Sequence, residues 1–349
     1  MASALDSAAP VRPGEELDPA RLAEFLERSL GLTGVLKVEQ FPRGFSNLTY
    51  LLRIGGRELV LRRPPFGVAK GVAHDMLREH RILSRLHPVL AVVPTPLAAC
   101  EDDAVLGAPF YVMERVPGVI LRERPPEGIT LDAPTMARLG ESLVDTLVSL
   151  HAVDVESAGL ADLGRRDGYV DRQVGGWSKR WMASRTDDVP EVERAIELLT
   201  SSRPPDSGFT VVHNDFKFDN LVLDPGSLAV RAVLDWEMAT AGDPLMDLGT
   251  TLGYWVERGD PESLRLLGLG VTQLPGSLTR QQVVERYGRA TGRDVSRWHW
   301  YHGFGLFKIA VIAQQIHARY RAGLTSDPRF ARLGDAVRAL GIAAEQALQ

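Results

Sequence analysis

The order of apolar and polar positions in the first 65 residues predicts one helix followed by a small antiparallel sheet. Between Asp18-Pro19 and Gly31 the apolar residues recur on one helical face, and the glycine follows them as a C-cap. Segments rich in β-forming residues come next, at 35–41, 48–54 and 58–63. Pro64-Pro65 ends the last of them, so these segments are expected to form three strands of a meander.

A second helix, a link and one more strand are predicted before the chain changes character. Apolar residues recur at helical spacing over 74–86, with Glu79 inside the pattern. A proline-rich link over 94–100 and a charged turn, Glu-Asp-Asp, lead to the apolar segment 110–116. Pro117-Gly118 follows that segment and suits a hinge, so we place a lobe boundary there.

Behind this boundary the pattern is mainly helical, with an apolar stripe from Met136 to Leu150. One β-like island interrupts it, at 209–226 and 230–237, where two β-branched segments flank a dense cluster of acids and amides. The predicted fold is therefore α+β and bilobal. It comprises a loose tail, a small antiparallel lobe and a mainly helical lobe, at 1–16, 17–116 and 117–349.

Composition and charge exclude several classes of protein. The 349 residues are 44% hydrophobic and 24% charged, with 40 basic and 45 acidic side chains, which is typical of a globular protein and disfavours dedicated nucleic-acid binding. The single cysteine, Cys100, cannot form an intramolecular disulfide, which fits a reducing cytosol. No secretory signal and no uninterrupted apolar span is seen, so we expect a cytoplasmic protein without a membrane partner.

The island carries the residues that indicate chemistry. Asp215 and Asn220 are five positions apart on a loop between two apolar segments, and Asp235 follows twenty residues after Asp215. This spacing suits kinase-type phosphoryl transfer, in which one carboxylate accepts a hydroxyl proton and oxygen donors hold Mg²⁺. Asn220 and Asp235 are oxygen donors of this kind. Lys217 is placed to neutralise charge on the transferred phosphoryl group.

The segments HNDFKFDN, LDWE and GDPLMDLG together resemble the aminoglycoside phosphotransferase and choline kinase family, over about residues 20–320. The segments RGFSNLTYLL, LVLRRPP, REHRIL, FYVMERVPG and LDWEMATAGDP most resemble the kinase-like domains that accompany acyl-CoA dehydrogenases. The resemblance implies a protein-kinase-like fold. It also implies that Asp215 is the catalytic base, that Asn220 and Asp235 are the Mg²⁺ ligands and that His213 orients the catalytic loop.

Several residues of the small lobe are candidates for binding the nucleotide. Arg62 occupies the place of the protein-kinase lysine, and Glu79 occupies that of its partner glutamate. The guanidinium group is always charged and suits phosphate. Arg63 beside it is a rival, and a surface salt bridge is the alternative role for Arg62.

Two backbone segments complete the expected nucleotide site. Ser46 and Asn47 lie in a loop with one glycine, Gly44, where backbone N–H groups and these side chains are expected to contact phosphate. An ordinary hairpin turn is the alternative. The backbone from Glu114 to Val116 is expected to pair with the adenine edge.

The acceptor pocket is expected in the helical lobe, where Trp298, Tyr301 and Lys308 lie in an aromatic stripe. A core stripe is the alternative. Residues 298–323 hold no Asp or Glu, which disfavours a polycationic aminoglycoside and favours an anionic, hydroxyacyl-CoA-like acceptor. Glu237 either holds metal-bound water or faces the acceptor, whereas Asp243 and Asp247 are expected to cap a helix or brace the loop.

The function predicted from these residues is transfer of the γ-phosphoryl group of ATP, or GTP, to a hydroxyl of a small molecule with Mg²⁺. The sequence holds no G-x-x-x-x-G-K-[ST] of a P-loop enzyme, and it lacks the D-F-G and A-P-E of a protein kinase. A nucleotide-binding pseudokinase and an interaction scaffold remain as alternatives. An aminoglycoside or an amino alcohol remains as an alternative acceptor, and the sequence does not indicate the oligomeric state.

Overall fold

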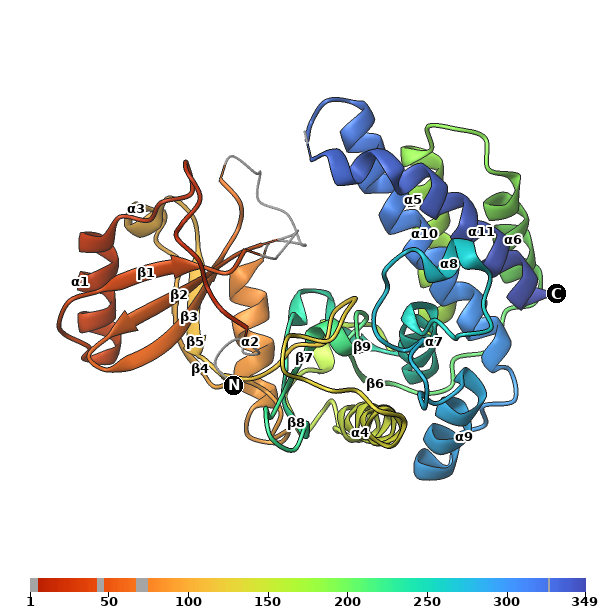
Figure 1. Ribbon diagram of the computed structural model, residues 1–349, viewed down its shortest axis with the longest axis horizontal. Coiled ribbons are helices and arrows are strands. Elements are labelled where there is room, and N and C mark those ends of the chain that lie inside the picture. Colours follow the sequence, from red (N-terminus) through yellow and green to blue (C-terminus); the bar gives the residue numbers. More distant parts are fainter. Residues whose placement is uncertain (1–5, 43–46, 67–74, 326) are drawn as a thin grey trace. The chain divides into compact units, whose positions relative to one another are not determined.

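The computed structural model describes residues 6–42, 47–66, 75–325 and 327–349. The chain forms two compact units (Figure 1): unit 1 comprises Met1–Ile120 and Asn220–Ala239, and unit 2 comprises Leu121–Asp219 and Thr240–Gln349. The sequence places the break at 116 and assigns all of 117–349 to one lobe. The structure instead groups 220–239 with unit 1, because Val119 and Leu223 exchange two backbone hydrogen bonds of 2.8 Å and the Val233 N–H donates to the Val92 carbonyl at 2.7 Å.

Unit 1 is built on a five-stranded sheet in the order β1-β2-β3-β5-β4, with antiparallel neighbours. Its strands are β1 (Lys37–Gln40), β2 (Leu48–Ile54), β3 (Arg57–Arg63), β4 (Pro96–Cys100) and β5 (Phe110–Glu114). The expected meander is present as β1 to β3. The proline-rich link, however, forms edge strand β4, which begins at a proline, where a missing N–H is tolerated. The charged turn leads into a short helix, α3 (Asp103–Leu106).

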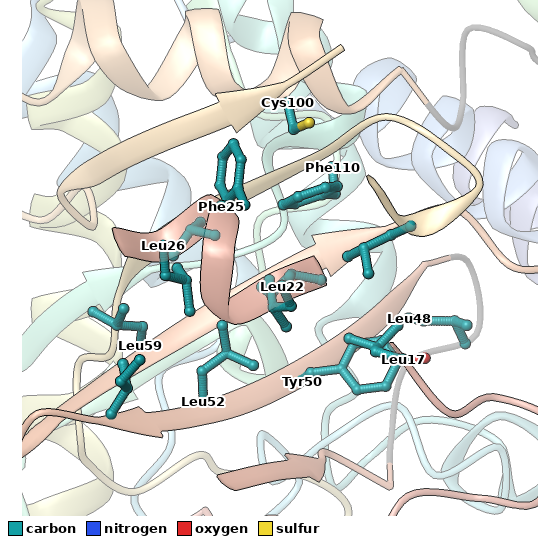
Figure 2. Close-up of a cluster of buried hydrophobic side chains, with 14 residues drawn as sticks. Leu17, Leu22, Phe25, Leu26, Leu48, Tyr50, Leu52, Leu59, Cys100 and Phe110 are labelled. Atoms are coloured by element: carbon teal, nitrogen blue, oxygen red, sulfur yellow. The ribbon is translucent and has the colours of Figure 1, made fainter. Parts of the chain in front are cut away.

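The helix α1 (Pro19–Leu30) covers one face of this sheet. Asp18 caps it by accepting hydrogen bonds from two backbone N–H groups of the first turn. Leu22, Phe25 and Leu26 are buried against alternate side chains of β2 and β3, and Figure 2 shows this cluster. Phe25 and Phe110 meet edge to face, with ring centroids 5.0 Å apart.

The helix α2 (Met76–Leu86) packs against β4 and β5 and buries Glu79 with its apolar residues. Successive side chains of a strand point to opposite faces. Leu61 belongs to the cluster under α1, so Arg62 points to the other face, where it is level with Tyr111 of β5. A separate ribbon of β7 (Leu221–Leu223) and β8 (Val230–Val233) completes unit 1.

Unit 2 is mainly helical. Its helices are α4 (Ala133–His151), α5 (Tyr169–Ser184), α6 (Pro190–Ser201), α7 (Pro244–Tyr254), α8 (Glu262–Arg265), α9 (Arg280–Thr291), α10 (Trp298–Arg321) and α11 (Leu333–Leu348). The strands β6 (Thr210–Val212) and β9 (Thr240–Gly242) form a two-stranded antiparallel pair. In the described part of the chain, no helix is long and apolar enough to span a membrane.

The helix α10 packs against α5, α6, α7 and α11. Its contact with α7 runs backbone to backbone, because a Cβ atom added at Gly305 would lie 2.0 Å from the Gly249 carbonyl oxygen. A Cβ at Gly249 would lie 2.2 Å from the Tyr301 carbonyl oxygen. The two glycines therefore set the spacing of the helices that lie beside the segment 213–220, which carries the candidate base Asp215.

Replacing Phe25 with alanine tests the core of unit 1. The variant should lose about 3–5 kcal/mol of unfolding free energy, because it removes a buried ring and leaves a cavity against Phe110. Urea unfolding measures the change. Val35→Ala is the matched control, since Val35 is 92% exposed and should shift stability by less than about 0.5 kcal/mol. Equal stability of Phe25→Ala and the native protein would contradict the packing described.

Candidate active site

The segment 213–220, which carries the candidate base Asp215, follows β6 in unit 2 and contacts a buried carboxylate. Asp247, on α7, accepts hydrogen bonds from the backbone N–H groups of His213 and Asn214, each at 2.7 Å. It also lies 3.1 Å from His151 Nε2, and the Nδ1 atom of that ring is 2.7 Å from the Tyr287 hydroxyl. Burial alone would raise the pKa of Asp247, but these partners hold it below its usual value. Asp247 thus braces the loop, as the sequence suggests.

Asp215 and Lys217 form a close ion pair at the end of this segment. Lys217 Nζ lies 2.9 Å from both carboxylate oxygens of Asp215 and 4.3 Å from the centroid of the Tyr254 ring. Burial would lower the pKa of Lys217, but Tyr254 and Asp215 raise it well above its usual value. Lys217 therefore remains a cation directly beside the Asp215 carboxylate.

Tyr254 is a residue of this site that the sequence analysis missed. Burial and the charge of Asp215 raise the pKa of its hydroxyl, so it stays a neutral donor beside the carboxylate. A signal was present, because Tyr254 follows Asp247 by seven positions, two turns along the same face of α7. Asp243, in contrast, caps α7 as expected by accepting from the Leu245 and Met246 N–H groups.

Unit 1 gathers a second charged cluster around Arg62. Its guanidinium group lies 3.0 Å from Glu79, 2.9 Å from Asp235 and 3.5 Å from Glu237. Burial would lower the pKa of Arg62, but these carboxylates raise it well above its usual value. Asn47 joins the cluster by donating to Glu237 at 2.6 Å. Among the described residues, three carboxylates lie around the Arg62 guanidinium group, and burial raises the pKa of one of them, Glu79.

The structure distinguishes Arg62 from its neighbour. Arg63 points to the opposite face of β3, where its guanidinium group lies 3.7 Å from the centroid of the Phe66 ring. Burial lowers its pKa. Arg62 is thus the arginine that meets the helix α2 and its Glu79.

The two expected metal ligands lie at one end of the β7–β8 ribbon. Asn220 directly precedes β7, Asp235 follows β8 by two positions, and the Leu234 N–H donates to the Asn220 carbonyl at 2.8 Å. Asp235 has a left-handed backbone with φ of 66° and a side chain that is 34% exposed. Arg78 of α2, another residue that the sequence analysis missed, donates to the Glu237 and Ala239 carbonyls and holds the chain beyond Asp235.

These donors fit a hard divalent cation. An amide oxygen and carboxylate oxygens are ligands that Mg²⁺ takes. In the described residues, no group of three or more His, Cys, Asp or Glu side chains is arranged to hold a metal. A Mg²⁺ ion bound through one or two carboxylates, phosphates and waters does not require such a group.

The proposed acceptor residues require a correction. Tyr301 and Lys308 are buried, 3% and 1% exposed, inside α10, so neither can contact a small molecule in this structure. Trp298 alone of the three is partly exposed, and its ring stacks on His299. The aromatic stripe is therefore core, because α10 is enclosed by four helices. Glu237 belongs to the cluster around Arg62.

The remaining nucleotide candidates have different positions. Ser46 lies outside the described residues. The N–H of Glu114 donates to the Thr95 carbonyl at 2.9 Å, so this donor is already used within the sheet. Val116 packs against the small apolar cluster beside the β7–β8 ribbon.

Residues 37–301 match the profile of APH, the phosphotransferase enzyme family. The chain belongs to this family. Acyl-CoA dehydrogenase family member 10 of Mus musculus is 34% identical over 321 residues, which cover 91% of the chain and 30% of the mouse protein. Family member 11 of Rattus norvegicus is 34% identical over 328 residues, covering 90% and 41% respectively. The chain thus spans about a third to two fifths of these relatives, and the expected resemblance is confirmed.

Solved structures confirm the kinase-like α+β fold of this phosphotransferase. A protein from Ralstonia eutropha, described as a candidate aminoglycoside phosphotransferase, has a TM-score of 0.79 and 29% identity and covers 95% of this chain and 98% of its own. A macrolide 2'-phosphotransferase type I has a TM-score of 0.59 and 20% identity, covering 93% and 97%. The aminoglycoside phosphotransferase APH(4)-Ia, in complex with ADP and hygromycin B, has a TM-score of 0.59 and 18% identity, covering 93% and 98%. The last two show the fold alone.

Replacing Asp247 with asparagine tests the brace. An amide has one acceptor oxygen in place of two, so one backbone N–H should lose its partner and the unfolding free energy should fall by about 2–4 kcal/mol at pH 7. The folded-state pKa of Asp247 is depressed, so its contribution is present above the unfolded pKa and is lost as pH falls through the folded pKa. Urea unfolding between pH 7 and pH 3 should therefore show a weaker acid dependence in the variant.

Asp188→Asn is the matched control, because Asp188 is exposed. It should retain both the stability at pH 7 and the native acid dependence. Native stability of Asp247→Asn would show that the carboxylate does not hold the loop.

Proposed function

We propose that the chain is a Mg²⁺-dependent phosphotransferase that moves the γ-phosphoryl group of ATP to a hydroxyl of a small molecule. The observation that carries the proposal is the setting of Asp215. Its carboxylate is paired with Lys217, and it follows a backbone that a buried carboxylate holds in place. A base for in-line transfer needs a carboxylate held in a fixed direction.

Within unit 2, each residue has a distinct part in the proposed reaction. Asp215 accepts the proton of the acceptor hydroxyl, and the Lys217 ammonium group beside it offsets negative charge. Tyr254 donates toward the same carboxylate and limits its rotation. Asp247 acts through the backbone and never touches the reactants.

Within unit 1, Asn220 and Asp235 are the residues that would hold Mg²⁺. When bound, the ion supplies positive charge to the phosphate oxygens. Arg62 is positioned by Glu79 and offers a planar cation for phosphate, and Asn47 adds a side-chain amide. Ser46, the Glu114 carbonyl and the Val116 backbone remain expected contacts of the nucleotide. ATP is favoured because APH(4)-Ia, which shares the fold, has been solved with ADP and with AMP-PNP.

For the acceptor we propose a hydroxyacyl-CoA-like compound. The support is the similarity to proteins named as acyl-CoA dehydrogenases, of which this chain matches only a part. The buried charge of Lys308 does not support an anionic acceptor, but Arg319 and Arg321 are exposed near the end of α10 and suit one. An aminoglycoside is the second candidate, because APH(4)-Ia was solved with hygromycin B. An amino alcohol is the third.

A thermal-shift titration with ATP or GTP tests the donor half. Mg²⁺ with ATP at a hundred times its dissociation constant should stabilise the fold by about 2.7 kcal/mol, because the ligand binds only the native state. Asp235→Asn should lose the Mg²⁺-dependent part. Asp224→Asn, an exposed acid in the turn of the same ribbon, is the matched control and should respond as the native protein does. No shift with any nucleotide would favour an interaction scaffold.

Replacing Asp215 with asparagine tests the base. The isosteric amide cannot accept the proton, so transfer from [γ-³²P]ATP should fall by about a thousandfold or more, while the nucleotide-induced shift stays. Transfer is measured against 3-hydroxyacyl-CoAs, hygromycin B and choline, with formation of a phosphorylated acceptor as the readout. Native turnover in Asp215→Asn would exclude this mechanism, and nucleotide binding without any transfer would favour the pseudokinase.

A further inference from the structure

The lysine that the sequence analysis assigned to the acceptor has a different environment. Lys308 is 1% exposed on α10, and its Nζ atom lies 2.7 Å from the Asn214 carbonyl oxygen. Asn214 Oδ1 and Thr250 Oγ1 are each 3.4 Å from Nζ, and the centroid of the Trp177 ring is 5.6 Å away. Over the residues that the structure describes, no carboxylate oxygen comes within 4.0 Å of this ammonium group.

Burying an ammonium group without a carboxylate partner costs free energy, so the hydrogen bonds that Lys308 makes in compensation show where it acts. The carbonyl oxygen that lies 2.7 Å from the Lys308 ammonium group belongs to the peptide group that joins Asn214 to Asp215. A peptide group is planar, so its carbonyl oxygen and its N–H move together. The N–H of this same group donates to His213 Nδ1 at 3.3 Å. The peptide that leads into the catalytic base is thus held at both ends.

Asn214 is also the residue at which the loop is strained. Its φ is 67°, a left-handed conformation that costs about 1–2 kcal/mol in a residue with a Cβ. Three partners hold it there: its N–H donates to Asp247, its carbonyl accepts from Lys308, and its side chain lies 3.3–3.4 Å from the Tyr169 hydroxyl. Without the contact to the carbonyl, the peptide can rotate toward a more relaxed conformation.

We propose that Lys308 is a positioning residue of the phosphotransfer reaction, whose ammonium group fixes the Asn214–Asp215 peptide and thereby the direction of the Asp215 carboxylate. The inference rests on the proposed function, because it assumes that Asp215 is the base. It assigns Lys308 no contact with the acceptor.

The charge of this lysine depends on pH in the physiological to alkaline range. Burial lowers the pKa of Lys308 to about 8, against the opposing effect of Asp247 on α7 and Asp215 in the loop. Lys217 and Arg180, the cations that also face it, lower the pKa further. The turnover number should therefore decline above about pH 8. Lys217 cannot cause this decline, because its pKa is raised.

Hydrogen exchange measured by mass spectrometry tests the proposal without any nucleotide or acceptor. In Lys308→Met at pH 7, amides of residues 212–220 should exchange about tenfold faster or more, because one charge-assisted bond is lost. Helices α10 and α11 should exchange as in the native protein, and Lys308→Arg should restore much of the protection. Lys179→Met, an exposed lysine on α5, is the matched control and should change nothing.

Unchanged exchange of 212–220 in Lys308→Met would overturn the proposal. Faster exchange spread evenly over unit 2 would also overturn it, because it would show a general structural role. Where transfer is measurable, the variant should lower kcat and leave KM for ATP unchanged. If the native protein binds no nucleotide, that result counts against the proposed function. The exchange of residues 212–220 still tests whether Lys308 fixes the Asn214–Asp215 peptide.

A second measurement uses the native protein and does not depend on folding of the variant. The chain has five lysines, so selective ¹³C labelling at their ε carbons gives five signals to follow by NMR between pH 6 and pH 11. One signal should titrate near pH 8. If every lysine titrates above about pH 9.5, the proposed buried ammonium group is excluded.

Discussion

The segment 213–220, which carries the candidate base, depends on the buried carboxylate of Asp247. Asp247 accepts from two successive backbone N–H groups, which fixes two peptide planes with one rigid side chain. The carboxylate can do this only while ionised. Burial opposes ionisation, but His151 and His213 lower the pKa of Asp247. The aspartate is held by α7, whose backbone lies against α10 at paired glycines. The position of the loop therefore follows from the packing of two helices.

The two units balance charge in opposite ways. In unit 2 the candidate base Asp215 lies beside the Lys217 ammonium group, and Lys308 contacts the peptide that precedes it. In unit 1, among the described residues, the Arg62 guanidinium group lies within 3.5 Å of three carboxylates. One of these, Asp235, is a candidate ligand of a divalent cation.

Sequence patterns predicted the strands in which buried and exposed positions alternate clearly, and they missed a strand that has no clear alternation. The alternation in 48–54 and 58–63 identified β2 and β3, whereas Pro96–Cys100 is a short edge strand with partly buried residues and no clear alternation. The HNDFKFDN segment indicated the candidate base, but no local pattern indicates a partner 94 positions away, such as Lys308 for Asn214. The sequence nevertheless contains a signal that Lys308 is buried and does not line a pocket. Residues 300–311 of α10 have no polar face, which is typical of an enclosed stretch of helix, and Lys308 within them is buried too.

Backbone strain gives an independent indication of where the chain is constrained for chemistry. Among the described residues other than glycine, three have positive φ: Asn214, Leu228 and Asp235. Leu228 lies in the tight turn between β7 and β8, where such a conformation is common. Asn214 directly precedes the candidate base, and Asp235 is a candidate metal ligand. Asparagine and aspartate tolerate this conformation better than other residues with a Cβ, yet each still costs free energy that neighbouring contacts must offset. At Asn214 these contacts come from Asp247 and Lys308, and at Asp235 from Arg62, so both strained residues are held by ionised groups.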